Sequence, residues 1–232
     1  YMSDVTDFLA QLQPLRETIS VKVPSLNKEV SVQELTFQQQ TKLLSANLDG
    51  YENTLKYINL LNTIILDNCT EQLSVVDRIP VILALRKHAI GSTYWTDEEE
   101  EIDINFYIDN WEACPATLDK VAVGNISISL SCPTIGGDFT HISRCIANTA
   151  ISMENVIYNE YIKFIDTIAI NDKTINFKQL KLQDCYSVLN ALPATAHRIV
   201  AKFIGNITDF ETSILTHNDV EIEIPPAFFA PS

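Results

Sequence analysis

The stretch VKVPSLNKEVSVQELTFQQQTKLL (Val21–Leu44) changes its periodicity in the middle, and this change indicates how the chain begins to fold. Its first part alternates apolar and polar residues on both sides of Pro24–Lys28, a segment rich in turn-forming residues. Alternation on both sides of a turn is typical of two paired strands. The sequence therefore predicts a β-hairpin between Ile19 and Leu35.

The second part of the same stretch has the pattern of a helix start. Thr36 is followed three residues later by Gln39, which makes an approximate capping box. Phe37, Thr41 and Leu44 then fall on one helical face. If Phe37 and Leu44 belong to the core, truncating either to alanine is expected to cost ~2–5 kcal/mol of stability.

Outside this junction, the spacing of apolar residues predicts further helices and strands. Helical spacing recurs after the junction and near the C-terminus, whereas the middle of the chain alternates apolar with acidic, amide or small polar residues. The predicted helices cover residues 53–65, 76–90, 156–168, 177–189 and 194–215, and the predicted strands cover 102–106, 121–130 and 220–224.

These elements predict an α+β fold in three regions. Residues 1–95 hold the N-terminal hairpin and helices, 96–145 an acidic loop and mainly antiparallel strands, and 146–232 helices and a strand tail. The boundary is placed at the self-repelling run Thr96–Glu101, which is typical of a solvated loop. The three regions can also form one compact domain.

Composition excludes several classes of function. The chain has 232 residues, of which 46% are apolar, and its 16 basic and 30 acidic residues give a net charge of −14. A negative field repels phosphate backbones, so we expect no nucleic-acid partner. No stretch approaches the ~20 apolar residues of a membrane span. The first residues lack a secretion signal and the five cysteines are widely spread, which favours a cytosolic protein with reduced thiols.

Signatures of catalysis and of metal binding are mostly missing. Gly136–Gly137 are the only adjacent glycines and are predicted to form a turn, and we assign no catalytic, cofactor-binding or metal-binding residue. His141 and Cys145 stand four residues apart, and Cys132 lies upstream. A metal-dependent or hydrolytic enzyme that uses these three side chains is therefore kept as an alternative, although structural roles for them are favoured.

The tail VEIEIPPAFFAPS (220–232) is the best candidate for an interaction with another protein. An alternating strand that ends in two phenylalanines can add to a partner's sheet edge and seat its rings in a pocket. The equal alternative is an edge strand whose phenylalanines lie in the protein's own core. The candidate residues are Ile222, Ile224, Pro225, Pro226, Phe228 and Phe229.

Four stretches resemble a known family. They are the opening stretch, VILALRKHAIGSTY (Val81–Tyr94) with Asp77–Arg78 before it, NALPATAHRIVAKFI (Asn190–Ile204) and EIEIPPAFF (Glu221–Phe229). Together they resemble the baseplate hub and hub-assembly proteins of T-even-type (T4-like) contractile-tailed phages. These proteins carry a P-S-x-x-K hairpin, an L-T-F-x-Q-Q-like helix start, a D-R…L-x-L-R…I-G helix and an F-F pair near the end. The matching positions here are Pro24, Ser25, Lys28, Leu35, Phe37, Gln39 and Arg86.

The resemblance implies a non-enzymatic protein made in the host cytoplasm. Such a protein either remains in the virion tail baseplate as a hub component or acts as a hub assembly factor, and its partners are other hub or tail proteins. The matching residues are implied to serve hairpin and helix architecture or contacts with neighbouring subunits. The oligomeric state stays open, and so does a general cytosolic binding adaptor outside phages.

Overall fold

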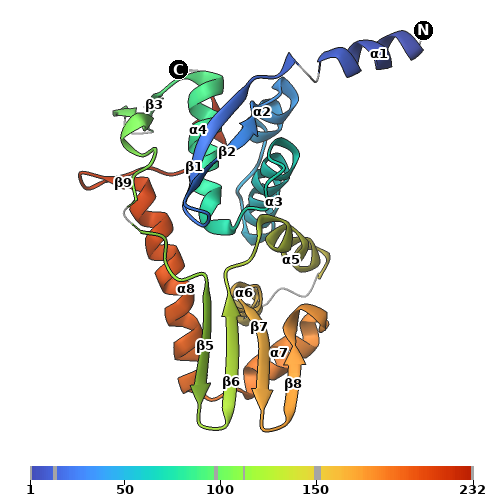
Figure 1. Cartoon of the computed structure of the whole chain (residues 1–232), viewed down its shortest axis with the longest axis vertical. Coiled ribbons are helices and arrows are strands. Elements are labelled where there is room, and N and C mark those ends of the chain that lie inside the picture. The colour runs from blue at the N-terminus through green and yellow to red at the C-terminus, as the bar shows by residue number, and fades with distance from the viewer. Residues whose placement is uncertain (1, 13–14, 97–98, 112, 149–152, 231–232) are drawn as a thin grey trace.

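The structure is a computed structural model that describes residues 2–12, 15–96, 99–111, 113–148 and 153–230, and within these residues the fold is α+β, as predicted (Figure 1). The elements in chain order are α1 (Met2–Leu12), β1 (Thr18–Val23), β2 (Lys28–Gln33), α2 (Phe37–Leu44), α3 (Tyr51–Asn68), η2 (Val75–Asp77), α4 (Arg78–Ile90), β3 (Thr93–Trp95), β4 (Glu101–Asp103), η3 (Ile104–Phe106), β5 (Leu118–Val123), β6 (Ile126–Ser131), α5 (Ile135–Ala147), α6 (Met153–Ile162), β7 (Ile165–Ile170), β8 (Lys173–Asn176), η4 (Phe177–Gln179), α7 (Leu182–Ala191), α8 (Ala194–Leu215), β9 (Thr216–His217), β10 (Val220–Glu221) and η5 (Pro226–Phe229).

The predicted hairpin is confirmed as β1 and β2, which pair antiparallel with Val21 opposite Val30. Asn27 adopts a positive φ of 46° in the turn, a conformation that asparagine tolerates better than most residues. The valines of both strands are buried, with β1 packed against α4 and β2 in contact with α3, while the alternate residues face solvent. The alternation in the sequence therefore reflects one buried face of a two-stranded ribbon.

The capping box at the start of α2 is also confirmed. Gln39 N donates to Thr36 Oγ1 at 3.1 Å, and Thr36 N donates to Gln39 Oε1 at 3.0 Å. The condition that Phe37 and Leu44 belong to the core is not met, because Phe37 is 86% exposed and Leu44 is exposed as well. α2 is anchored instead through Leu43, which is fully buried and points about 100° away from Leu44 around the helix axis.

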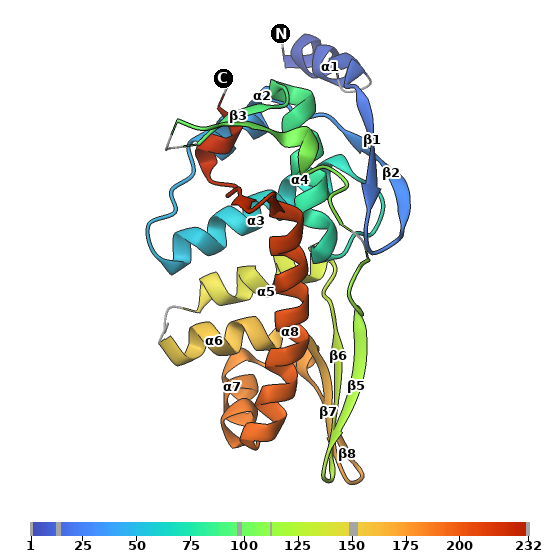
Figure 2. The same ribbon diagram turned by 90° about the vertical axis from the view of Figure 1, so that its left-hand side faces the viewer.

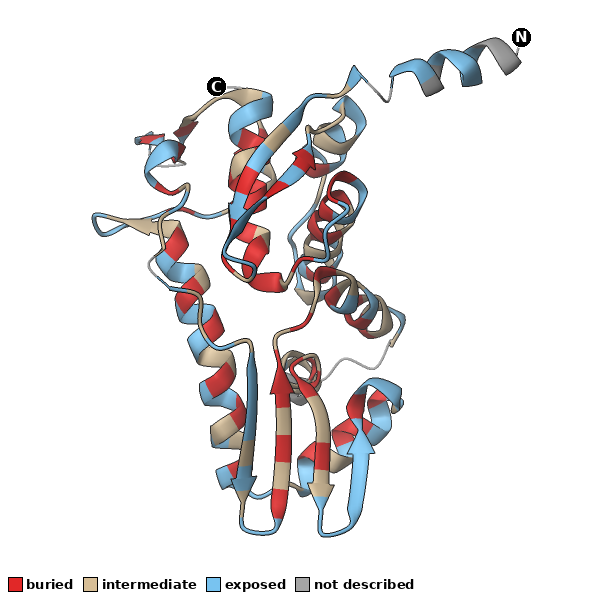
Figure 3. Cartoon of the chain, in the orientation of Figure 1, coloured by how far each residue is buried: buried red, intermediate tan, exposed pale blue. Residues whose placement is uncertain are grey.

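A four-stranded antiparallel sheet forms the other end of the molecule, with strand order β5-β6-β7-β8. Ile128 of β6 pairs with Val121 of β5 and Ile168 of β7, and both isoleucines are buried. Figure 2 shows α6, α7 and α8 on one side of this sheet. In Figure 3, buried residues alternate with less buried ones along β6 and β7, as expected for a sheet covered on one face.

Several predicted boundaries are wrong in the second half of the chain. The helix predicted for 156–168 ends at Ile162, and the residues after Lys163 form β7 instead. The region 177–189 begins with the 3₁₀ helix η4, and α7 starts only at Leu182. β8 was not predicted. These strands depend on pairing with β6 and with each other, which a local period does not reveal.

Three further expectations need correction. Gly136–Gly137 do not form a turn but lie in the first turn of α5, which Thr134 caps by accepting a hydrogen bond from Gly137 N at 3.0 Å. Ile104 and Phe106 belong to the 3₁₀ helix η3 rather than to a strand. The strand expected for 220–224 pairs only at Val220 and Glu221, opposite β9.

The acidic run lies where β3 turns into β4, and its Asp97 and Glu98 fall outside the described residues. The long helix α8 runs from the sheet end of the molecule back toward α4, and the C-terminal segment then returns beside α2 and α4 (Figure 2). α1 projects away from the body (Figure 1). No helix in the described parts of the chain has the length and apolar character required to cross a membrane.

Candidate interaction site

The C-terminal tail follows a path fixed by hydrogen bonds to distant elements. Ile222 N donates to Leu215 O at 2.9 Å, and the Tyr57 hydroxyl donates to Ile224 O at 3.0 Å. The prolines then lead into η5, where Phe228 N donates to Pro225 O. Since proline lacks a backbone N–H and has a fixed φ, the Pro225–Pro226 pair suits the point at which the strand-like segment ends.

The two phenylalanines of the tail lie in the protein's own core. Phe228 and Phe229 have no exposed surface, and their rings meet edge to face at a centroid distance of 5.5 Å. Phe228 also contacts Tyr94 edge to face at 5.0 Å. Of the two arrangements considered for these aromatics, the structure therefore adopts the intramolecular one.

The other tail candidates differ in accessibility. Ile222 is buried, whereas Ile224, Pro225 and Pro226 are half-buried. A partner can therefore reach the last three in the folded chain. The buried residues Ile222, Phe228 and Phe229 support this surface from beneath.

Arg86 of α4 holds the tail in place. Its Nε donates to Phe228 O at 3.1 Å, its Nη2 donates to Thr93 O at 2.6 Å, and its Nη1 donates to Gly91 O. The guanidinium also lies over the Phe228 and Tyr94 rings, at 5.4 and 5.9 Å from their centroids. Burial lowers the pKa of Arg86 from its ordinary value. We call Arg86, Tyr94, Phe228 and Phe229 the tail clamp.

The sequence contains a signal for Arg86 but not for its partner. That signal is the family resemblance, because Arg86 is one of the positions that carry it. Its acceptor lies 142 residues away in the tail. Nothing in the local pattern predicts such a contact.

Other positions of the resemblance also meet residues from distant parts of the chain. Ser25, in the hairpin turn, donates from its N and its Oγ to the Asp77 carboxylate at 2.8 and 2.5 Å. Burial raises the pKa of Asp77, and the hydrogen bonds from Ser25 oppose this shift. Gln39 exchanges hydrogen bonds with Asn68 of α3 at 3.1 and 3.2 Å. These residues fasten the hairpin and α2 to the helical core.

Phe37 is the exception among the matching positions. It starts α2 with its side chain in solvent, and Thr41 and Leu44 follow on the same exposed side. The grouping of these three residues on one face is as predicted, but the face points outward. We call Phe37, Thr41 and Leu44 the α2 face.

Two of the three side chains of the enzyme alternative, Cys132 and His141, line one cavity beside α5, but the three do not cluster. Cys132 accepts a hydrogen bond from Ser74 Oγ at 3.2 Å, whereas His141 Nε2 lies 2.8 Å from Asn159 O and 3.4 Å from Cys145 Sγ. In the described residues, no three His, Cys, Asp or Glu side chains lie close enough to hold a metal ion.

The contact between His141 and Cys145 is not an activated nucleophile. Burial raises the pKa of Cys145 to about 12, and burial together with nearby Lys163 lowers the pKa of His141 to about 4. Both groups are therefore neutral near pH 7. An activated cysteine requires the opposite shift of its thiol pKa.

A second buried polar centre joins the two ends of the molecule, and the sequence did not predict it. Asp138 of α5 is fully buried and accepts hydrogen bonds from Arg78 Nη2 at 2.5 Å and Asn62 Nδ2 at 2.9 Å, and Lys163 Nζ lies 3.8 Å from its second oxygen. Burial alone would raise the pKa of Asp138, but Arg78, Lys163 and Asn62 hold it below its ordinary value. We call these four residues the polar junction.

Comparison with known proteins gives a family match over nearly the whole chain. The family model described as T4 bacteriophage base plate protein matches residues 16–230. No curated protein and no solved structure shows a significant match. The matched range includes the hairpin, the α2 face, the tail clamp and the polar junction.

Proposed function

The chain belongs to the T4 bacteriophage base plate protein family, and from this premise we propose that it is a non-enzymatic component of the baseplate hub or a factor that assembles the hub. Membership makes it a protein of the phage tail baseplate. The hub, the assembly role and the absence of catalysis are the further steps of the proposal.

The observation that carries the proposal is the contrast between Phe37 and the other matching positions. Ser25, Gln39 and Arg86 bind other parts of the chain and so serve its architecture. Phe37 is 86% exposed and has no comparable place in the core. An exposed aromatic side chain on a rigid, capped helix is well suited to bury its ring in a partner protein.

We therefore propose that the α2 face contacts another hub or tail protein. The accessible tail residues Ile224, Pro225 and Pro226 are a second candidate contact. The two surfaces belong to neighbouring elements, because Gln40 Nε2 of α2 donates to Phe229 O at 3.1 Å. A partner that binds α2 can thus distinguish a chain whose tail is docked from one whose tail is not.

Charge and local chemistry support the remaining parts of the proposal. A net charge of −14 disfavours nucleic acid as a partner, and the neutral His141 and Cys145 pair offers no nucleophile. We propose that the protein is made and binds its partners in the host cytoplasm during tail assembly. A hub component then remains in the virion, whereas an assembly factor leaves.

Co-expression with the hub proteins of the same phage tests the proposal. Wild-type protein is expected to co-purify with at least one of them, and Phe37→Ala is expected to reduce this binding at least tenfold. Phe106→Ala is the matched control, because Phe106 is a phenylalanine with 58% exposure on η3. Equal binding by wild type and Phe37→Ala would contradict the α2 face as the contact.

Mass spectrometry of gradient-purified virions separates the two roles. Copies in the particle support a hub component, and their absence together with a hub complex supports an assembly factor. A chain that is absent from virions and forms no complex with hub proteins has neither role, and the proposal then fails.

A further inference from the structure

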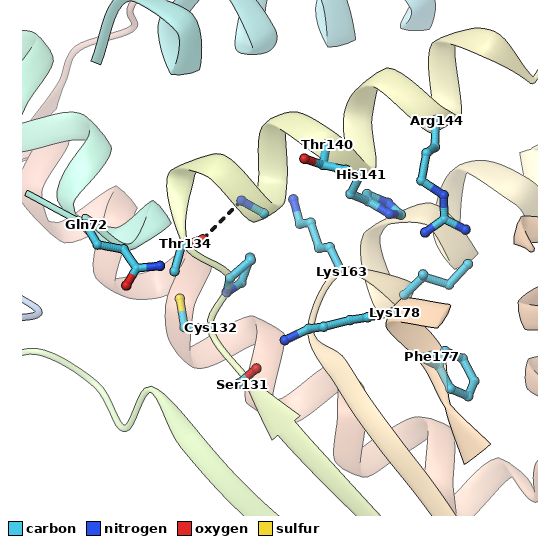
Figure 4. A pocket seen from close by; sticks show the side chains of 13 residues that line it. Gln72, Ser131, Cys132, Thr134, Thr140, His141, Arg144, Lys163, Phe177 and Lys178 are labelled. Atoms are coloured by element: carbon cyan, nitrogen blue, oxygen red, sulfur yellow. Dashed lines mark hydrogen bonds between the residues drawn. The ribbon is translucent and has the colours of Figure 1, made fainter. Parts of the chain in front are cut away.

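A cavity of about 500 Å³ lies beside the N-terminal half of α5, between the end of β6, the residues before β7, and η4 (Figure 4). Its volume lies within the ~300–1,000 Å³ typical of sites for small molecules. The cavity is separate from the α2 face and from the tail clamp, and the baseplate role does not account for it.

The charges on its wall are unusual for this chain. Arg144, Lys163 and Lys178 line the cavity, and none of the described lining residues is acidic. The whole sequence has almost twice as many acidic as basic residues. In Figure 4, Lys163 reaches toward the first turns of α5, and Lys178 extends across the cavity toward Ser131. Three cations from different elements therefore converge on one space.

Carboxylates contact the two lysines, but these contacts do not use all of the N–H donors of the lysines. Lys163 Nζ contacts Glu160 at 2.6 Å and Asp138 at 3.8 Å, and Lys178 Nζ contacts Asp166 at 2.5 Å. An ammonium group has three N–H donors, so these contacts do not exhaust either lysine. The carboxylates also keep Lys163 charged, because they raise its pKa although burial alone would lower it.

Arg144 and the start of α5 add to the same preference for negative charge. Arg144 Nη2 donates to Leu180 O at 2.6 Å, which uses one of the five N–H donors of its guanidinium. Thr134, the N-cap of α5, and Gly137, in the first turn of α5, also line the cavity. The positive end of the helix dipole therefore faces the same space as the lysines.

The remaining wall mixes polar and apolar groups: Gln72, Ser131, Thr140 and His141 lie there beside Cys132, Pro133, Ile162 and Phe177. Phe177 and Ile162 line the cavity, and their side chains are buried in the core with little or no exposed surface. A bare inorganic ion is much smaller than the cavity and would leave most of its volume unfilled. The wall fits the body of an organic molecule, such as a ring or a short alkyl group.

We propose that this cavity binds a small organic oxyanion. Its carboxylate or phosphate group lies between Lys163, Lys178 and the first turn of α5, and its organic part occupies the remaining volume of the cavity. The ligand is a small molecule, so the site is distinct from the contacts with tail proteins proposed above.

Calorimetric titration of the full chain tests this site with phenyl phosphate, benzoate and inorganic phosphate as probes, at one fixed ionic strength. Phenyl phosphate or benzoate is expected to bind saturably and more tightly than inorganic phosphate. Lys178→Gln is expected to weaken that binding by about fivefold or more, since it removes one charge-assisted contact. Lys178 is 61% exposed, so this variant is expected to fold, and its thermal unfolding checks that.

Lys173→Gln is the matched control, because it removes an exposed lysine of β8 that does not line the cavity. Its binding is expected to stay within about twofold of wild type. Equal losses in both variants would reveal a general charge effect and overturn the site. So would the lack of saturable binding by all three probes up to ~10 mM, or binding of inorganic phosphate as tight as that of the two organic probes.

Discussion

The tail clamp and the polar junction both bury a charged side chain, but the two charges are neutralised in different ways. In the tail clamp, Arg86 donates to backbone carbonyl oxygens and lies against aromatic rings. In the polar junction, Asp138 is met by the full positive charges of Arg78 and Lys163 and by the Asn62 amide. One centre uses fixed dipoles, and the other uses ionic partners.

Because of this difference, the stability of the two centres depends on different conditions. Carbonyl dipoles do not titrate, and arginine stays protonated at any ordinary pH, so the tail clamp depends on the presence of the tail itself. The polar junction contains Asp138 and borders on His141, both of which change charge in acid. We therefore expect substitution to affect the tail clamp most and pH to affect the polar junction most.

The largest effect is expected at the tail clamp. Phe228→Ala removes a fully buried ring that contacts Tyr94, Phe229 and the Arg86 guanidinium. Loss of the ring and of its packing is expected to cost ~3–5 kcal/mol of the free energy of unfolding. Urea unfolding monitored by circular dichroism at pH 7 measures the change.

Phe106→Ala gives the comparison for this loss. The Phe106 ring is 58% exposed and stacks on His217 at the surface, so its removal is expected to cost less than ~1 kcal/mol. If the two variants lost the same free energy of unfolding, the burial of Phe228 in the tail clamp would not stabilise the protein. The prediction concerns stability alone, and it holds whether or not the tail also contacts a partner.

The second prediction concerns His141, beside the polar junction. Burial lowers its pKa from 6.5 to about 4, so between these values the unfolded chain binds a proton that the folded chain does not. Stability therefore falls as the pH falls through this window, and His141 contributes about 2 kcal/mol to the loss between pH 7 and pH 5. His141→Gln is expected to remove that part of the pH dependence in urea unfolding.

Phe228→Ala is the control for this test. Phe228→Ala is expected to lower stability at both pH values and to keep the wild-type difference between them, since the tail clamp has no group that titrates there. A His141→Gln variant with the wild-type pH dependence would show that His141 is not the responsible group. Asp138 acts in a separate window, because its lowered pKa places its loss of stabilisation below about pH 4.

Local patterns predicted the elements that local interactions decide. The hairpin follows from alternation around a turn, and the start of α2 follows from the Thr36 and Gln39 capping box. Each feature depends on a few neighbouring residues. The family resemblance added the baseplate class, which no local pattern contains.

Elements and contacts set by distant residues were missed. Ile165 and Ile168 have a spacing compatible with a helix, yet they lie in a strand because β6 and β8 pair with it. The burial of Phe228 is decided by Arg86, and that of Asp138 by Arg78 and Lys163. Burial of this kind is a property of the assembled fold, so the sequence left the two arrangements of the tail equally open.

The smallest expected effect concerns α2, where the helical period was correct and the sequence left open whether Phe37 and Leu44 face the core or solvent. Periodicity groups Phe37 with Leu44 but does not say whether that face or the one with Leu43 meets the core. Phe37→Ala is expected to change the free energy of unfolding by less than ~0.5 kcal/mol, because its ring is already in water. Leu43→Ala is expected to cost ~2–5 kcal/mol, because Leu43 is fully buried. Urea unfolding of both variants decides which face meets the core. If Phe37→Ala lost as much free energy of unfolding as Leu43→Ala, Phe37 would belong to the core. The α2 face would then not be a binding surface.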